Sequence, residues 1–310
     1  MNDQRLDQLE DWLEVFFDDA SFTLSKASDD ASFRRYFRIE RSNLSFIAMD
    51  APPAKENSKL FINIANLLRS NNIHAPKIID ADLAQGFLLI EDLGNTTFLQ
   101  ALNGKTNLDL YRLAIDELIK IQKIDVKTHL LNQYDQTLLK KELALLIDWY
   151  LPKNIQQKTI ADLNQLFDQL IQNSLNSPQV FVHRDYHCRN LMITHDKITI
   201  IDFQDAVVGS NTYDLVSLLK DAYFELSPTE IQTLLTYFYE QDNVQVSFAE
   251  FEKQFDLMGL QRHLKILGIF KRLSIRDGKH QYLNDIPLVK KHALQMADKY
   301  PEFSLLKAIL

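Results

Sequence analysis

Three side chains with oxygen atoms stand at spacings that suit the transfer of a phosphoryl group. Asp185 is followed five residues later by Asn190, and Asp202 comes twelve residues after Asn190. Phosphoryl transfer needs a carboxylate that accepts a hydrogen bond from the attacking hydroxyl, together with hard oxygen ligands for a Mg²⁺ that bridges the ATP phosphates. We therefore interpret Asp185 as the catalytic residue and Asn190 and Asp202 as Mg²⁺ ligands.

The segment between Asn190 and Asp202 must bring these two ligands together. Two short β-like runs lie on either side of the turn Thr194–Lys197. This pattern predicts a β-hairpin. A hairpin of this length would return Asp202 to the neighbourhood of Asn190 at the floor of a cleft.

The residues around Asp185 fit the catalytic-loop pattern of kinases, His-Arg-Asp-Leu-x-x-x-Asn, except that Tyr186 stands in place of Leu. His183 and Arg184 are expected to brace the loop rather than react. Asp205, three residues after the second metal ligand, is a candidate for a further contact to the metal. A lone Asp-x-x-x-x-Asn carries no information, but the joint pattern with the hairpin and Asp-Phe is a strong signal.

The elements that must position these residues fall into two parts. The first, residues 1–93, is expected to contain one helix and a small antiparallel sheet, with the helix at 57–70 and strands at 33–39, 44–49, 78–81 and 86–90. The second, residues 94–310, is expected to be mostly helical around a β-rich island at 179–203, with helices at 108–124, 137–150, 158–175, 212–224, 228–239, 247–273 and 287–299. The prediction is an α+β fold of the two-lobed, protein-kinase-like kind. Its boundary is the acidic turn Glu91–Asn95, and a ligand cleft is expected between the lobes.

Composition excludes several other classes of protein. The hydrophobic share of 46% and the charged share of 25% are typical of a globular protein. A net charge of −8 argues against binding nucleic acid through its phosphates. The single cysteine, Cys188, rules out an intrachain disulfide. A metal site from Cys188, His183 and His187 is an alternative, but no second cluster completes the ligand set.

No targeting or membrane segment is evident in the sequence. Leu9, Trp12, Leu13 and Phe16 lie at helical spacing among acidic residues, which predicts an amphipathic helix and not a secretory signal. No apolar run approaches the roughly 20 residues that span a bilayer. We therefore expect a cytoplasmic protein whose partner is a small molecule, with its oligomeric state left open.

The metal-site sequence resembles one branch of the protein-kinase-like fold. Asp202-Phe203-Gln204-Asp205-Ala206 is similar to the aminoglycoside phosphotransferase and choline kinase-like family, in which the metal aspartate begins Asp-Phe or Asp-Trp and is followed by Asp-Ala. The downstream Tyr213-Asp214-Leu215 also matches this branch. The resemblance implies a kinase that uses ATP and Mg²⁺, in which Asp214 anchors a helix near the loop.

A closer resemblance covers nearly the whole chain. The segments that carry it are similar to those of the bacterial anomeric N-acetylmuramate/N-acetylglucosamine kinases, and they are Ser32–Arg38, Met49–Pro53, Leu89–Gly94, Gln261–Phe270 and Arg276–Lys279. This resemblance implies transfer of the γ-phosphate of ATP to the C1 hydroxyl of a free amino sugar. The implied product, a sugar 1-phosphate, serves to rebuild UDP-sugars in peptidoglycan recycling.

Two departures from the protein-kinase pattern concern the grip on the ATP phosphates. Met49 stands where Val-Ala-Ile-Lys has its lysine, and the loop Ser28–Phe33 lacks the usual glycines. We expect Arg34 or Arg35 to reach the phosphates instead, since a guanidinium forks well onto phosphate oxygens. The alternative is that both are solvated charges on a strand.

Other binding residues are expected by analogy with related kinases. On the nucleotide side, Glu91 and Leu93 would offer backbone hydrogen bonds to adenine, and Ala48 and Ile200 would line an apolar slot unless they are plain core. The candidates on the acceptor side are His187, Arg189, Glu142, Trp149, Arg262 and His263. Muramate carries a lactyl carboxylate, so an arginine near Asp185 would be useful, but the sequence does not identify which one.

Three alternative functions remain open. One is a kinase for another small alcohol, such as an aminoglycoside, a choline-like compound or another sugar. The missing lysine and glycines favour a non-catalytic, nucleotide-binding pseudokinase, whereas the intact Asp185, Asn190 and Asp202 oppose it. A protein kinase is disfavoured because no Ala-Pro-Glu motif and no activation-loop stretch follow Asp202.

Overall fold

Residues 3–28, 33–128 and 131–310 are described by the computed structural model, and they divide into two units. The smaller unit consists of Met1–Thr96 and Met192–Gln204, and the larger of Thr97–Leu191 and Asp205–Leu310. The segment 192–204, which the sequence analysis assigned to the second lobe, therefore groups with the first. The α+β class expected from the sequence is confirmed.

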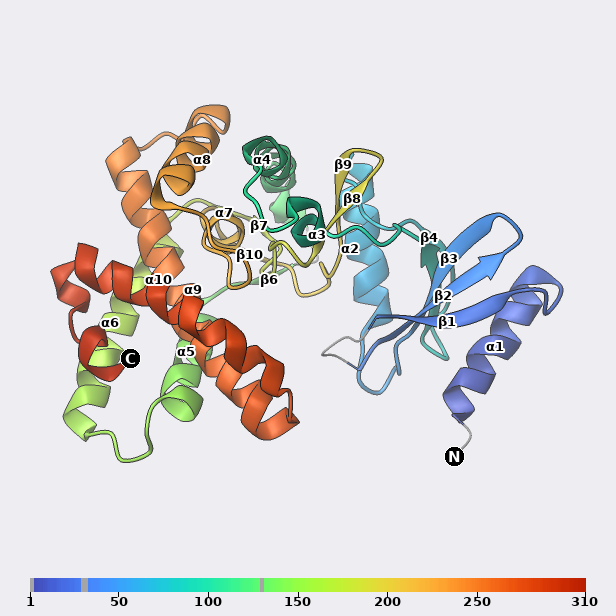
Figure 1. Ribbon diagram of the computed structural model, residues 1–310, viewed down its shortest axis with the longest axis horizontal. Helices are drawn as coiled ribbons and strands as arrows, with labels where there is room; N and C mark the ends of the chain where they lie inside the picture. The colour runs from blue at the N-terminus through green and yellow to red at the C-terminus, as the bar shows by residue number, and fades with distance from the viewer. Residues whose placement is uncertain (1–2, 29–32, 129–130) are drawn as a thin grey trace. The chain divides into compact units, whose positions relative to one another are not determined.

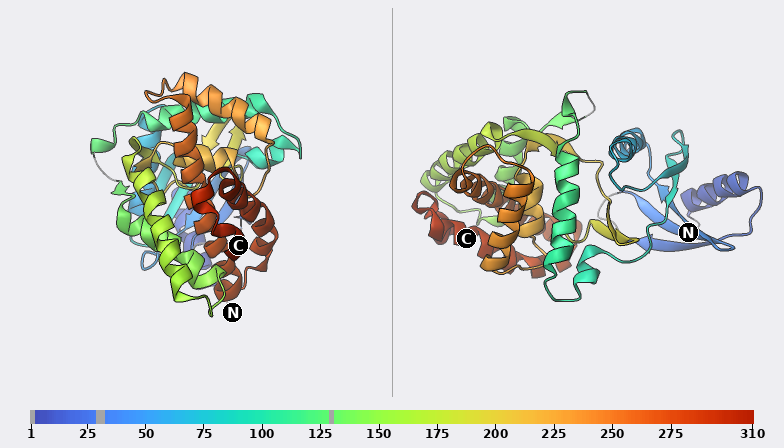
Figure 2. Two further views of the ribbon diagram at one scale, coloured as in Figure 1. Left: turned by 90° about the vertical axis from the view of Figure 1, so that its left-hand side faces the viewer. Right: turned by 90° about the horizontal axis from the view of Figure 1, so that it is seen from above.

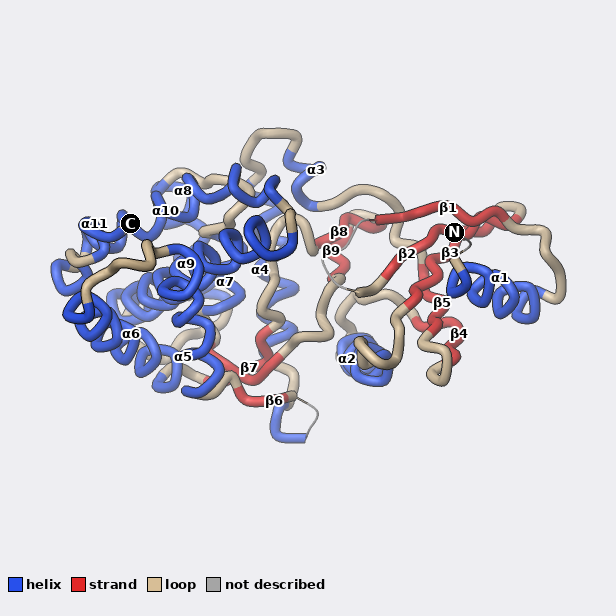
Figure 3. Tube along the Cα trace, turned by 90° about the horizontal axis from the view of Figure 1, so that it is seen from below, coloured by secondary structure: helices blue, strands red, loops and turns tan. Residues whose placement is uncertain are grey.

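The smaller unit is built on a five-stranded antiparallel sheet with the strand order β1-β2-β3-β5-β4 (Figure 3). Its strands are β1 (Thr23–Ser28), β2 (Arg35–Arg41), β3 (Leu44–Asp50), β4 (Ile78–Asp82) and β5 (Phe87–Glu91). Four of them lie where the sequence predicts strands. The edge strand β1 was not predicted, because Thr-Leu-Ser-Lys-Ala-Ser contains a single large apolar residue and gives no clear alternation.

Two helices lie on opposite sides of this sheet (Figure 1). Helix α1 (Gln4–Phe17) buries Leu9 and Leu13 in one cluster with sheet residues such as Phe37 and Leu89. Helix α2 (Ser58–Ser70) is capped by Asn57 and presents the buried row Phe61, Ile64, Ala65 and Leu68. The ring of Phe61 packs 4.8 Å from that of Phe203, which joins segment 192–204 to the smaller unit.

The predicted hairpin is confirmed as strands β8 (Leu191–Thr194) and β9 (Lys197–Ile200). Its turn places His195 and Asp196 at φ of 51° and 58°. Two successive left-handed residues are typical of the tight type I′ turn, which matches the twist of the paired strands. Ile193 N–H donates to the Thr96 carbonyl and Ile200 N–H to that of His74, both at 2.9 Å, so both strands are tied to the smaller unit.

Helices dominate the larger unit. They are α3 (Phe98–Leu102), α4 (Leu108–Gln122), α5 (Gln136–Leu145), α6 (Gln157–Asn176), α7 (Tyr213–Leu219), α8 (Pro228–Gln241), α9 (Phe248–Asp277), α10 (Ile286–Lys299) and α11 (Leu306–Ile309), with the 3₁₀ turns η1 (Val126–Thr128), η3 (His280–Asp285) and η4 (Pro301–Phe303). A π-helical turn, η2 (Leu146–Tyr150), continues α5. Helix α9 contacts α5, α6, α7, α8 and α10, so it is the central helix of this unit (Figures 1 and 2). All seven predicted helices are present, whereas the short α3 and α11 were not predicted.

A three-stranded sheet completes the larger unit, with the strand order β6-β10-β7. Its strands are β6 (Asn132–Gln133), β7 (Gln179–Val182) and β10 (Val207–Ser210). Strand β7 ends directly before His183, so its pairing with β10 fixes the start of the loop that carries Asp185. Among the described residues, no helix is both long enough and apolar enough to cross a membrane.

We predict opposite outcomes for two glycine substitutions on α9. A Cβ at Gly268 would lie 2.4 Å from the backbone carbon and oxygen of Leu145, whereas one at Gly259 would meet nothing closer than 3.5 Å. Gly268→Ala should lower the free energy of unfolding by about 1–3 kcal/mol, because the packed backbone of α5 has to move. Gly259→Ala should leave it unchanged or raise it by up to about 1 kcal/mol, because alanine favours helix. Denaturant unfolding measures both, and equal effects would contradict this packing.

Candidate active site

The loop His183–Asn190 is tied down by two buried carboxylates. Asp214, at the start of α7, accepts hydrogen bonds from the backbone N–H of His183 at 2.6 Å and of Arg184 at 3.0 Å. Asp221 accepts one from Cys188 N–H at 2.9 Å. Burial raises the pKa of Asp214 to about 6, against the opposing effect of His183 and of these N–H groups. The loop backbone is thus held near both of its ends.

Asp185 is presented by this loop with 44% of its side chain exposed. Its carboxylate lies 3.8 Å from the guanidinium of Arg262. Burial acts to raise its pKa, but the charges of Arg262, Lys265, His187 and Arg184 outweigh burial and lower it to about 2. Asp185 is therefore ionised at neutral pH, ready to accept a hydrogen bond.

Asn190 is fixed by the loop itself. Its Nδ2 donates to the Asp185 carbonyl at 3.1 Å, and its backbone N–H donates to the His187 carbonyl at 2.9 Å. These bonds fold the loop back on itself, so the structure brings Asp185 and Asn190 together. The amide oxygen of Asn190 is a hard ligand of the kind that Mg²⁺ prefers.

A buried network of charges supports the loop from α5 and α9. Glu142 accepts hydrogen bonds from Tyr134 and Arg184 and forms an ion pair with Lys265 at 3.2 Å. Arg262 donates to the Arg184 carbonyl at 3.0 Å. Burial acts to raise the pKa of Glu142, but its two cationic partners lower it. Glu142, expected on the acceptor side, is thus the anion that holds Arg184 and Lys265 in place.

Two other acceptor candidates, His263 and Trp149, do not belong to the loop. His263 is completely buried, bonds the Lys220 carbonyl through Nε2 at 2.9 Å and stacks on His292. Burial lowers its pKa, so it is a neutral core histidine, and the acceptor contact expected of it does not fit. One residue along a helix turns the side chain by about 100°, which separates His263 from its neighbour Arg262. Trp149 lies on η2 and is partly exposed.

His187 and Arg189 flank one aromatic ring beside the loop. The His187 ring meets that of Tyr223 edge-on at 5.1 Å, and the Arg189 guanidinium lies 3.6 Å from the centre of the same ring. His187 is buried, which lowers its pKa, whereas Arg189 is exposed. Of the acceptor candidates, His187 and Arg189 thus belong to the loop, and Arg262 and Glu142 contact it.

Asp202 lies in the smaller unit. It follows β9, has a φ of 63° and accepts a hydrogen bond from Gln204 Nε2 at 2.8 Å. Arg184, at a φ of 76°, shares this left-handed conformation. Such conformations cost non-glycine residues about 1–3 kcal/mol and cluster at functional sites.

Asp205, the further candidate for a metal contact, has an exposed side chain. Its backbone carbonyl accepts a hydrogen bond from Arg184 Nη1 at 3.4 Å.

The arginines expected at the phosphates have carboxylate partners in the smaller unit. Arg34 forms an ion pair with Glu56 at 2.7 Å, in which both side chains are nearly buried. Arg35 pairs with Asp3 and donates through Nε to Asp50 at 2.8 Å. The expected glycine-poor loop falls largely on residues 29–32, which lie outside the described residues.

The expected adenine-site residues also lie in the smaller unit. Ala48 is completely buried in the cluster that the sheet forms with α1, which fits plain core rather than an open slot. Ile200 is completely buried too. Glu91 donates its N–H to the Lys77 carbonyl at 2.9 Å, and the Leu93 carbonyl accepts from Thr194 Oγ1 at 3.3 Å.

The donor set fits a Mg²⁺ ion that arrives with its nucleotide. Within the described ranges, no three His, Cys, Asp or Glu side chains gather to hold a metal ion. The metal site considered at His183, His187 and Cys188 is therefore not supported there. Mg²⁺ is usually bound through one or two carboxylates together with phosphates and water. Asn190 of the larger unit and Asp202 of the smaller unit each carry an oxygen of this kind.

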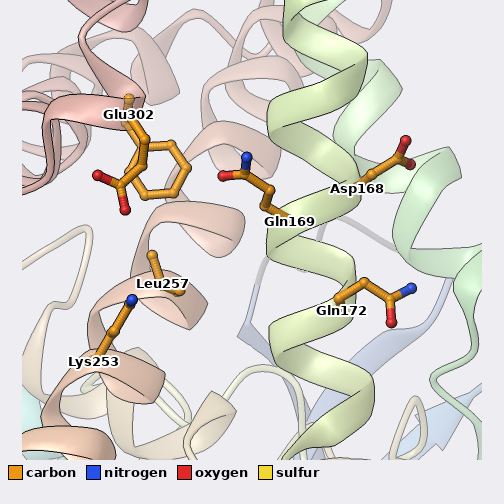
Figure 4. A pocket seen from close by; sticks show the side chains of 7 residues that line it. Asp168, Gln169, Gln172, Lys253, Leu257 and Glu302 are labelled. Carbon is orange, nitrogen blue, oxygen red and sulfur yellow. The ribbon is translucent and has the colours of Figure 1, made fainter.

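Two surface hollows are lined by residues outside the loop of Asp185. One of about 450 Å³ lies between α6, α9 and η4, lined by residues that include Asp168, Gln172, Lys253 and Glu302 (Figure 4). A second, of about 560 Å³, lies at the start of α2. Neither is lined by the loop of Asp185, so the candidate site rests on the loop geometry.

A family match agrees with this geometry. Residues 23–246 match the family described as "Phosphotransferase enzyme family". The chain belongs to this phosphotransferase family. It is 38% identical to a Pseudomonas aeruginosa protein named N-acetylmuramate/N-acetylglucosamine kinase, over 100% of this chain and 97% of the relative. A Neisseria meningitidis protein of the same name is 37% identical, over 99% and 95%.

Solved structures show the same fold at low sequence identity. A Plasmodium vivax ethanolamine kinase matches with a TM-score of 0.67 at 14% identity, covering 92% of this chain and 84% of the other. The aminoglycoside phosphotransferase APH(2″)-Ib, bound to ADP, matches at 0.62 and 14%, covering 96% and 99%. The protein-kinase-like fold is confirmed, and this member of the phosphotransferase family is a kinase.

Three residues that hold this loop or its partner Glu142 in place were not predicted from the sequence: Asp221, Tyr134 and Lys265. Asp221 has no motif around it, and its role depends on where α7 ends. Lys265 carried a usable signal, because a lysine flanked by Leu264 and Ile266 on a buried turn of helix needs a buried anion.

We predict that Arg262 sets the protonation of Asp185 in the kinase reaction. In Arg262→Met the carboxylate loses the cation that lowers its pKa most, so its pKa should rise and the acid limb of kcat/KM should move to higher pH. Arg262→Lys keeps the charge and should keep the limb closer to that of the wild type. The measurement is kcat/KM from the lowest pH at which each variant stays folded up to pH 8, where a wild type with Asp185 ionising near 2 should show no acid limb above about pH 4. A Met profile that overlays the wild type after scaling would rule out this electrostatic role.

Proposed function

We propose that this chain is an ATP- and Mg²⁺-dependent kinase that phosphorylates the anomeric C1 hydroxyl of N-acetylmuramate and N-acetylglucosamine. The observation that carries the proposal is a pinned, half-exposed, ionised Asp185 in a chain that is similar over its full length to kinases named for these sugars. The sugar 1-phosphate product suits the rebuilding of UDP-sugars in peptidoglycan recycling.

The roles of the three polar residues follow from the chemistry of phosphoryl transfer. Asp185 accepts a hydrogen bond from the acceptor hydroxyl, aligns it with the γ-phosphate and receives its proton. Asn190 and Asp202 supply the oxygens that would hold Mg²⁺. When bound, the metal neutralises charge on the phosphates. Positioning and charge neutralisation account for most of the catalysis, so few oriented groups suffice.

On the nucleotide side, the backbone of Glu91–Leu93 offers hydrogen bonds to adenine, and Arg34 or Arg35 reaches the phosphates in place of the missing lysine. The ion pair Arg34–Glu56 supports this role, because Arg34 lies directly before strand β2 and Glu56 lies two residues before helix α2. Active protein kinases have a comparable pair between a strand lysine and a helix glutamate. Ala48 and Ile200 contribute packing beneath this region.

We predict that Arg34→Ala or Arg35→Ala raises the KM for ATP by roughly 10- to 100-fold, because a charge-assisted bond to phosphate is lost. Arg41→Ala is the matched control, since Arg41 also lies on β2 and pairs with an aspartate, Asp19, at 2.8 Å. Steady-state kinetics with varied ATP measure the effect. A normal ATP KM in both variants would remove the phosphate role.

Asp185→Asn and Asp202→Ala should separate chemistry from nucleotide binding. We predict that Asp185→Asn lowers kcat by about 10²–10⁴-fold while ATP still binds, because only the acceptor hydroxyl loses its partner. Asp202→Ala should abolish Mg²⁺-dependent nucleotide binding. Titration calorimetry and turnover assays measure the two effects, and near-normal turnover of Asp185→Asn would end the assignment.

A panel of acceptors tests the substrate proposal directly. ADP release is followed with N-acetylmuramate, N-acetylglucosamine, an aminoglycoside, choline and simple alcohols, and ³¹P spectra identify the phosphorylated carbon. Phosphate on C1 of either sugar supports the proposal. Transfer only to another alcohol, or ATP binding without any transfer, would replace it.

A further inference from the structure

The three arginines around Asp185 differ in their availability to a ligand. Arg262 has 4% of its side chain exposed and donates to a backbone carbonyl. Arg184 has 20% exposed and binds the buried Glu142. Arg189 has 46% exposed, and its carboxylate partner, Asp285, is 4.0 Å away. Arg189 is therefore the arginine of this group that can exchange its partner for a ligand.

Arg189 is also held in a defined place. Its guanidinium lies 3.6 Å from the centre of the Tyr223 ring, which supports a cation by its π face. The Tyr223 ring continues into an aromatic group on α9 and η3, through Phe270 at 6.2 Å and then Tyr282 at 5.2 Å from Phe270. A stacked guanidinium keeps its N–H groups directed outward, where they can fork onto a carboxylate.

The loop brings this arginine close to the catalytic carboxylate. Arg189 follows Asp185 by four residues, which span at most about 14 Å even when fully extended. The loop is not extended, because Asn190 Nδ2 donates to the Asp185 carbonyl at 3.1 Å. In N-acetylmuramate the carboxylate stands on the C3 substituent, on the same small ring as the C1 hydroxyl. A guanidinium on the same folded loop as Asp185 is where such an acceptor would need it.

We propose that Arg189, stacked on Tyr223, binds the carboxylate of an acidic amino-sugar acceptor and so makes the enzyme prefer N-acetylmuramate to neutral N-acetylglucosamine. This inference rests on the proposed function and adds to it the residue that distinguishes the two acceptors. Asp285 occupies the guanidinium when no acceptor is bound and gives way to the sugar carboxylate. Neutral sugars use the same loop without this contact.

The test compares both acceptors in four proteins: wild type, Arg189→Ala, Arg189→Lys and Arg112→Ala. Arg112 is the matched control, because it also pairs with an aspartate, Asp109, and lies 5.8 Å from a tyrosine ring, but on α4. Arg189→Ala should lose roughly 10- to 100-fold in kcat/KM on N-acetylmuramate and less than about 3-fold on N-acetylglucosamine. Arg189→Lys should retain part of the preference, because it keeps the charge without the fork.

A second measurement separates recognition from a structural role. The KM for N-acetylmuramate should rise with salt in the wild type and much less in Arg189→Ala, since screening weakens an exposed charge pair. If Arg189→Ala does not fold, Arg189→Gln keeps the length of the side chain and serves in its place.

Equal losses on both acceptors, or no loss on either, would overturn the assignment of Arg189 and leave the proposed function standing. A wild-type protein that phosphorylates neither sugar would overturn both.

Discussion

Two buried carboxylates hold the backbone on which the rest of the site depends. Asp214 and Asp221 accept hydrogen bonds from N–H groups at both ends of the loop His183–Asn190. A hydrogen bond to a charged group contributes about 1.5–3 kcal/mol, and the two to Asp214 together exceed the roughly 1–3 kcal/mol that the left-handed Arg184 costs. Asp214 therefore helps to offset the cost of the strained residue that comes directly before Asp185.

A second constraint is the placement of cations in the interior of the larger unit. Arg262 and Lys265 project from α9, which is buried on nearly all sides over its central turns. A buried cation is costly unless it is paired and hydrogen-bonded. Glu142 and backbone carbonyls meet this requirement, and burial, which acts to lower the pKa of Lys265, is outweighed by Glu142. Both cations stay charged, and their field keeps Asp185 ionised.

Much of this arrangement was predictable because it is local in the sequence. The hairpin 191–200 follows from two β-like runs around a turn, and the roles proposed for Asp185 and Asn190 follow from a loop pattern of eight residues. The helices were readable from periodicity. The edge strand β1 was not, because an edge strand needs little apolar alternation. Short helices such as α3 depend on their caps and give no periodic signal.

The support of the site could not be read from the sequence, because it depends on contacts between distant segments. Asp221 contacts the loop 33 residues before it, and Glu142 reaches Arg184 across 42 residues. No local pattern encodes such pairs. The same reason explains His263, which is adjacent to Arg262 in sequence but belongs to a different side of α9. A residue's neighbour in a motif is not its neighbour in space.

The alternation of buried and exposed residues within the loop has a chemical consequence. Tyr186, His187 and Cys188 are buried, whereas Asp185 before them and Arg189 after them have 44% and 46% of their side chains exposed. A rigid segment thus presents one anion and one cation at a fixed separation. A flexible loop would allow the two opposite charges to pair with each other and neutralise the site. Asp214 and Asp221 hold the loop backbone, and Tyr223 and Asp285 hold Arg189, so the two charges need not neutralise each other.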